Sequence, residues 1–341
     1  MTKDILMCML TTCVSNLIIK SGWKLIHGDV FRFPKSSMIF CAAVGTGTQL
    51  MITTFALLLL SLTGYISTTR RGSILAASVL LYCLTSVIGG YKATKLFFQM
   101  NGKMWARCVL LTAVLFPFPV VAVFASANSV AIMHGSISAL PFGTIMLLSA
   151  LYALVCVPLT LLGGILAKNF AKKDMEAPTR TTKVAREIPT EVPFLKSQFI
   201  QRVIAGFLPF SAIYIELHYI FTSMWGHQIY TMFGILFFAF VLLVIVTSSI
   251  TVSLLYFQLS REDHRWWWAT FINGGMIGFF IYAYSFYFYF HRSGMSGLLQ
   301  STFYFGYMAI ISFAFFLMLG SAGFQVSLVF VKYIYGRVKC D

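Results

Sequence analysis

One carboxylate, Glu216, stands inside a long apolar run with the sequence PFSAIYIELHYIF. A charge at membrane depth costs about 2.5–3.5 kcal/mol on insertion scales, so such residues are candidates for ion binding. Pro209 lies two helical turns earlier and on roughly the same helix face, where it removes a backbone hydrogen bond. Two interpretations stay open: an ion site in a transporter or channel, or a neutral glutamic acid bonded to a neighbouring helix.

The other polar residues form no recognisable catalytic or metal-binding pattern. The six histidines show no i, i+4 pairing and no HExxH motif, and the seven cysteines form no CxxC pair. Nucleotide-binding glycine loops and a serine nucleophile elbow are absent from the sequence. We therefore expect no metal, no cofactor and no enzymatic activity, and we interpret the cysteines as small apolar packing residues.

Two further motifs indicate contact with helices or lipid. Gly274 and Gly278 form a GxxxG motif, whose flat surface lets helices approach closely. The partner is either another helix of the same bundle or the transmembrane helix of another protein. Trp266, Trp267 and Trp268 lie at a predicted membrane boundary, where tryptophan typically sits among the headgroups. We therefore predict an aromatic belt that anchors this helix at the interface.

The composition predicts an all-α polytopic membrane protein. Hydrophobic residues make up 59% of the 341-residue chain and charged residues only 10%, against about 25% charged in ordinary soluble domains. A membrane helix needs about 20 apolar residues. Eight stretches meet this length, at residues 38–63, 73–91, 108–133, 141–167, 203–224, 230–258, 267–290 and 300–331.

The distribution of positive charge predicts the orientation. The segments on the side of the N-terminus carry 22 of the 25 Lys and Arg residues, and the opposite segments carry three. Basic loops favour the cytosolic side, so the net charge of +15 indicates anionic membrane lipid rather than nucleic acid. We predict a cytosolic segment 1–37, four spans over 38–167, a cytosolic loop 168–202, four spans over 203–331, and a cytosolic tail 332–341.

Several short stretches, taken together and in order, resemble the nonaspanins, the transmembrane 9 superfamily. They are residues 21–32 (SGWKLIHGDVFR), 45–50 (GTGTQL), 69–72 (TRRG), 141–144 (PFGT), 158–164 (PLTLLGG), 215–217 (IEL), 256–259 (YFQL) leading into Glu262, Asp263 and the tryptophans, 304–307 (YFGY) and 338–341 (VKCD). The resemblance runs from about residue 21 to residue 341. Family members normally begin with a signal peptide, a lumenal domain and a first span. The sequence shows none of these, so the family's nine spans become eight.

The resemblance also implies a function. Nonaspanins are Golgi and endosomal membrane proteins that help to sort other membrane proteins, including clients with glycine-rich transmembrane helices. Their C-terminal Lys-x-Asp/Glu signal binds coatomer (COPI) and retains them in the Golgi. In this sequence the signal corresponds to Lys339 and Asp341. A non-enzymatic sorting protein is therefore the leading hypothesis, and a transporter or channel that uses Glu216 is the alternative.

Overall fold

The computed structural model describes most of the predicted membrane region. It covers residues 23–24, 26–63, 72–135, 141–170, 181, 186, 198–223, 229–292 and 297–337. Side chains are described for these residues except 198–199, 213, 215–223, 229–232 and 292. Predictions on residues 1–22, on most of the loop 168–202 and on residues 338–341 fall outside these ranges.

The described elements are all helices. They are α2 (Ser37–Leu62), α3 (Ser73–Gln99), α4 (Trp105–Leu115), α5 (Pro117–Met133), α6 (Phe142–Leu151), the π-helix η1 (Tyr152–Cys156), α7 (Val157–Phe170), α8 (Gln198–Ser223), α9 (Ile229–Ser260), α10 (Trp266–Arg292) and α11 (Leu298–Gly336). Within the described residues there is no strand. The all-α polytopic fold is therefore confirmed.

Seven segments of the described chain are long and apolar enough to cross a membrane: α2, α3, α4 with α5, α6 through α7, α9, α10 and α11. The remaining predicted span, 203–224, corresponds to α8. The helices extend beyond the predicted apolar runs, and α3 continues from residue 91 to Gln99. Lys92 and Lys95 lie in this extension. The helix can continue past the apolar run because a long basic side chain near a helix end can extend toward water.

Prolines divide two of the spans. Pro117 begins α5 directly after α4, because proline cannot donate the backbone hydrogen bond that would continue the helix. Pro158 is the second residue of α7, which begins directly after η1. A proline ring clashes with the carbonyl four residues earlier, and the wider π turn before Pro158 relieves that clash.

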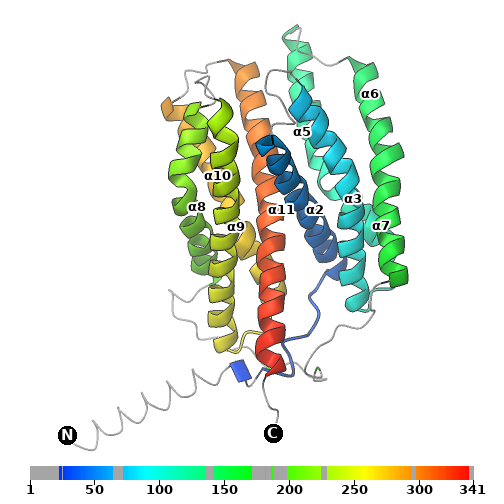
Figure 1. Cartoon of the computed structure of the whole chain (residues 1–341), viewed down its shortest axis with the longest axis vertical. Coiled ribbons are helices and arrows are strands. Elements are labelled where there is room, and N and C mark those ends of the chain that lie inside the picture. Colours follow the sequence, from blue (N-terminus) through cyan, green and yellow to red (C-terminus); the bar gives the residue numbers. More distant parts are fainter. Residues whose placement is uncertain are drawn as a thin grey trace, which may run out of the picture.

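Helix α11 runs through the middle of the bundle and contacts α2, α5, α9 and α10 (Figure 1). Helices α8, α9 and α10 lie on one side of it, and α3, α6 and α7 lie on the other (Figure 1). Glycine allows the close approach of α2 to α11, because a Cβ at Gly47 would collide with the Leu317 carbonyl. The two sides of the bundle therefore meet where α2 packs against α11.

Several polar side chains inside the bundle form hydrogen bonds within or between helices. Thr46 donates a hydrogen bond of 2.9 Å to the Ala42 carbonyl, one turn earlier in α2. Gln325 of α11 donates a bond of 2.9 Å to the Thr48 hydroxyl of α2. Such bonds remove the cost of a bare polar group in hydrocarbon, so these residues can occupy the centre of a membrane protein.

Candidate functional site: a polar cap at one end of the bundle

The densest network of described polar contacts lies at one end of the bundle. We call it the cap, and it comprises residues 23–35, the α9–α10 connection 258–266, Arg186, and the end of α11 at residues 331–337. Apart from Arg186, each of these parts is adjacent to a helix end, so the cap depends on how the bundle brings those ends together.

Residues 23–35 fold back against the end of α11. The Tyr335 hydroxyl donates a hydrogen bond of 2.7 Å to the Trp23 carbonyl, and the two rings meet edge-on with centroids 5.8 Å apart. Ile26, Val30 and Phe31 are buried beneath this contact. The first and last described parts of the chain therefore lie at the same end of the bundle.

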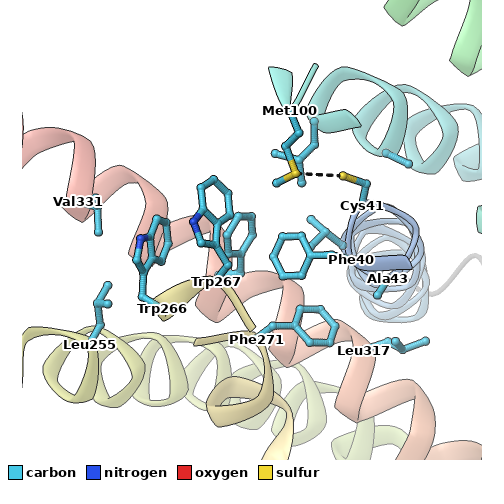
Figure 2. Close-up of a cluster of buried hydrophobic side chains, with 14 of the residues drawn as sticks. Phe40, Cys41, Ala43, Met100, Leu255, Trp266, Trp267, Phe271, Leu317 and Val331 are labelled. Carbon is cyan, nitrogen blue, oxygen red and sulfur yellow. Dashed lines mark hydrogen bonds between the residues drawn. The ribbon is translucent and has the colours of Figure 1, made fainter. Parts of the chain in front are cut away.

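Trp266 and Trp267 lie inside the protein, between α9, α11 and α2 (Figure 2). Trp266 and Trp267 are 0% and 2% exposed, and their rings stack with centroids 4.6 Å apart. The Trp266 Nε1–H donates 2.7 Å to the Val30 carbonyl, and the partly buried Trp268 donates 3.0 Å to the Lys35 carbonyl. The predicted aromatic belt is therefore wrong for Trp266 and Trp267. Residues 23–35 cover them and supply an acceptor that headgroups would otherwise provide.

The α9–α10 connection is tied together by Asp263. Gln258 Nε2 donates 3.2 Å to one carboxylate oxygen of Asp263, and the Arg265 backbone N–H donates 3.0 Å to the other. Glu262, next to Asp263, has φ of 64°, in the left-handed region that non-glycine residues rarely adopt. A non-glycine residue held in this backbone conformation costs free energy, so contacts around it must offset that cost.

Arg186, from the long predicted cytosolic loop, joins two parts of the cap. Its backbone N–H donates 3.1 Å to Asp29, and its guanidinium lies 2.9 Å from the Glu262 carboxylate. Asp29 also pairs with Arg32 at 2.7 Å. The Glu262 side chain is 17% exposed and that of Arg186 is 43% exposed, so water partly screens this ion pair. The loop is thus fastened to the cap at Arg186.

Arg261 connects the cap to α8. When its amide oxygen faces Arg261, Gln201 of α8 accepts hydrogen bonds of 3.2 Å and 2.5 Å from the guanidinium. Burial lowers the pKa of Arg261, and the nearby Asp263 carboxylate opposes that shift. The partly buried cation therefore has a neutral acceptor and a carboxylate nearby to stabilise its charge.

The contacts of the cap join separate parts of this chain to one another. Its carboxylates, on Asp29, Glu262 and Asp263, all pair with arginine side chains or backbone N–H groups. Among the residues that the structure describes, no three His, Cys, Asp or Glu side chains are grouped to hold a metal ion. The arrangement holds Arg186, the α9–α10 connection and the start of the described chain in fixed positions.

The family comparison agrees with the residues that build this cap. The chain matches the family described as Endomembrane protein 70 over residues 4–298. Transmembrane 9 superfamily member 3 of Arabidopsis thaliana is 52% identical over 322 residues, covering 94% of this chain and 54% of that protein. This chain belongs to the transmembrane 9 superfamily.

A more distant relative extends the comparison to mammals. Transmembrane 9 superfamily member 1 of Mus musculus is 44% identical over 321 residues, covering 94% of this chain and 53% of that protein. The chain thus spans about half the length of these superfamily relatives. No solved structure matches the chain. The family match begins at residue 4, earlier than the resemblance from about residue 21 that short motifs alone indicated.

In this transmembrane 9 superfamily chain, the Gly274–Gly278 face is occupied by α11. A Cβ at Gly274 would lie 2.6 Å from the Leu319 carbonyl oxygen, and one at Gly278 would collide with the Ser312 carbonyl oxygen. The expectation of a groove for another protein's helix is therefore wrong at this face. The sequence pattern indicates a close contact, but only the packing shows which helix fills it.

The other predicted residues lie apart from the cap. Pro209 is buried inside α8, and Glu216 belongs to the same helix two turns later, at a position whose side chain is not described. Lys339 and Asp341 fall outside the described residues. The structure therefore does not bring Glu216, the tail motif and the GxxxG motif together into one site.

The sequence missed the links among Asp29, Arg186 and Glu262. Asp29 and Arg186 are 157 positions apart along the chain, and Glu262 lies in a third segment, so no spacing rule connects them. A signal was present in the family motifs, since residues 21–32 and 256–268 carry both the resemblance and most of the cap.

Proposed function

We propose that this protein is a multi-pass component of Golgi or endosomal membranes that helps to sort other membrane proteins without catalysing a reaction. Membership of the transmembrane 9 superfamily supports a membrane protein of the endomembrane system. The observation that carries the finer proposal is that α11 ends at Gly336 inside the cap, beside residues 23–35 and the loop held by Arg186. A sorting signal in the last residues would start from this rigid platform.

The tail has the chemistry of a short charged signal. Lys339 offers an ammonium group, and Asp341 offers a side-chain carboxylate next to the terminal one. Charge-assisted hydrogen bonds are about twice as strong as neutral ones, so these groups suit a receptor with separate acidic and basic pockets. In this proposal coatomer (COPI) is the receptor, and both termini face the cytosol.

Replacing both charged residues of the motif tests this proposal. We expect Lys339→Ala with Asp341→Ala to leave folding intact, to weaken coatomer binding in pull-downs, and to release the protein from the Golgi in microscopy. Arg337→Ala is the matched control, because it removes a neighbouring positive charge and leaves the motif. If the double variant stays in the Golgi while labelling shows a cytosolic tail, the signal lies elsewhere.

Clients with glycine-rich transmembrane helices would need a surface other than the Gly274–Gly278 face. Helix α6 offers one, because none of its residues is buried and the space around Gly143 is open. We propose that a client helix contacts this face. A photo-crosslinker at Leu147, which is 61% exposed, should then capture clients, whereas one at Leu319, which is 0% exposed, should not. Capture at neither position would exclude α6 as the client surface.

The alternative function, a transporter or channel, depends on Glu216. The presence of Pro209 within the same helix favours testing it. If Glu216 is structural, Glu216→Gln should be nearly silent, and Glu216→Leu should destabilise the bundle by about 1 kcal/mol. If Glu216 carries protons or cations, Gln should abolish function while folding survives. A well-folded but inactive Gln variant would therefore favour transport over the structural interpretation.

A further inference from the structure

Two cysteines on neighbouring membrane spans lie in direct contact. The Sγ atoms of Cys83, in α3, and Cys156, in η1, are 2.9 Å apart. The other described cysteines have different neighbours: Cys41 lies 3.7 Å from the Met100 sulfur, and Cys108 lies 3.9 Å from the Met38 carbonyl oxygen. Cys83 and Cys156 therefore form the single thiol–thiol contact in the described part of the chain.

The backbones that carry these thiols are held in place by close helix packing. A Cβ added at Gly90 of α3 would collide with the Thr160 carbonyl oxygen of α7, and one at Gly163 of α7 would collide with the Val87 carbonyl oxygen of α3. These contacts lie one to two turns beyond the cysteines on both helices. The two spans therefore cannot separate at the thiols without losing contacts between their backbones.

A third contact positions η1 itself. The Tyr152 hydroxyl donates a hydrogen bond of 2.6 Å to the Ala113 carbonyl, which joins η1 to α4. Cys156 is the buried residue of η1 and is 1% exposed. The π-helix therefore presents Cys156 toward α3 from a fixed backbone.

We propose that Cys83 and Cys156 form a disulfide bond that joins α3 to the α6–η1–α7 span. An S–S bond is about 2.05 Å long, so the two sulfurs need to approach by less than about 1 Å. This inference is independent of the proposed sorting function. It replaces the expectation, drawn from the scattered spacing of the cysteines, that these two residues serve only in packing.

The oxidant in this proposal is a disulfide-bonded carrier, either a protein dithiol–disulfide oxidoreductase or glutathione disulfide. One cysteine thiolate attacks the carrier disulfide, forming a mixed disulfide and releasing one carrier thiol. The second cysteine thiolate then attacks the first cysteine's sulfur and releases the other carrier sulfur as a thiol. The two cysteine thiols lose two protons and two electrons, and the carrier disulfide gains them.

The folded structure indicates when this reaction occurs. Cys156 is buried in the completed bundle, and both cysteines lie within membrane-spanning segments, so the exchange must occur before these segments enter the hydrocarbon and α7 packs against α3. Cys83 lies ten residues after the start of α3, about 15 Å along the helix, on the part of α3 that lies beside η1. The bond then closes a loop between residues 73 positions apart. It secures a span whose α6 part buries no residue.

Peptide mapping of the full-length protein tests the proposal directly. Membranes are treated with N-ethylmaleimide to block free thiols, denatured without reductant, and digested. We expect a cross-linked peptide pair containing Cys83 and Cys156, which disappears after dithiothreitol treatment. Recovery of both cysteines in alkylated form without reductant would overturn the proposal.

A cleavage assay gives an independent measurement. A protease site inserted between Gly135 and Pro141 divides the chain between the two cysteines. We expect the fragments to stay together on denaturing gels until they are reduced. Cys83→Ser or Cys156→Ser should release them without reductant, whereas the matched controls Cys41→Ser, Cys108→Ser and Cys340→Ser should not. Separation of the wild-type fragments without reductant, or release by a control variant, contradicts the Cys83–Cys156 bond. If a serine variant fails to fold, the wild-type peptide map still decides.

Discussion

The less hydrophobic of two spans, α10, is the more buried, and the more hydrophobic α6–η1–α7 span is the less buried. In soluble proteins the more hydrophobic segment is usually the more buried one. The span Trp266–His291 has a mean hydropathy of 1.2 and half of its most apolar window is buried. The span Phe142–Phe170 has a mean hydropathy of 2.4, yet only 11% of the corresponding window is buried. Lipid solvates apolar side chains as well as the protein interior does, so hydrophobicity alone does not drive burial.

Glycines explain why α10 is the more buried of the two spans. Gly274, Gly278 and the facing Gly320 of α11 allow the two backbones to approach closely, which increases dispersion contact. In contrast, a Cβ at Gly143 of α6 would meet nothing within 4 Å. The same residue type is thus a packing requirement in one span and neutral in the other.

The largest expected loss of stability comes from adding a methyl group at a closely packed glycine, compared with the same change at an open one. In Gly278→Ala the new Cβ would collide with the Ser312 carbonyl oxygen and lie 2.9 Å from the Phe316 nitrogen. Because both atoms are backbone, we expect a loss of about 1–3 kcal/mol in the free energy of unfolding. Gly143→Ala is the control and should change stability by less than about 0.5 kcal/mol. Thermal unfolding in detergent measures both, and equal effects would contradict the comparison.

The second expected effect distinguishes the stability contributed by a tryptophan hydrogen bond from that contributed by packing of the tryptophan ring. Trp266→Phe and Trp267→Phe each remove part of a buried indole, but only Trp266 donates to a described acceptor, the Val30 carbonyl. We expect Trp266→Phe to be the more destabilising by about 1–3 kcal/mol, since it leaves the Val30 carbonyl without that donor. Protease sensitivity of residues 23–35 should rise in the same variant. A belt function at the headgroups would instead make the two substitutions alike.

The smallest expected effect concerns the ion pair that fastens the loop. Arg186→Ala, Glu262→Ala and the double variant form a cycle whose coupling we expect to be about 0.5 kcal/mol, because Arg186 is substantially exposed. The coupling should fall as salt concentration rises. Glu262→Gly adds a test of strain, because glycine accepts the positive φ of 64° while the carboxylate is lost. A coupling that does not respond to salt would argue against an ion pair.

Much of the fold could be predicted from the sequence, whereas little of the cap could. The apolar runs located all the helices to within a few residues, except where α3 and α11 extend past the apolar stretch. The prediction correctly placed the tryptophans at a helix boundary. It expected them among lipid headgroups, whereas Trp266 and Trp267 are buried inside the protein. Their burial depends on residues 23–35, which are more than 230 positions away in the chain. Local sequence patterns carry no information about such a contact.

The sequence by itself determined the class of protein and the approximate position of each described helix, because the length of an apolar run and the rarity of charge are properties of each segment alone. It also determined family membership, since that depends on residues compared one by one. The tertiary structure decided which glycine face is filled, which tryptophans are buried, and how Asp29, Arg186 and Glu262 meet. It also brought Cys83 and Cys156 together. The physical reason is that in lipid every apolar surface is acceptable, so partners are chosen by shape and hydrogen bonding between distant segments, which appear only when the bundle has assembled.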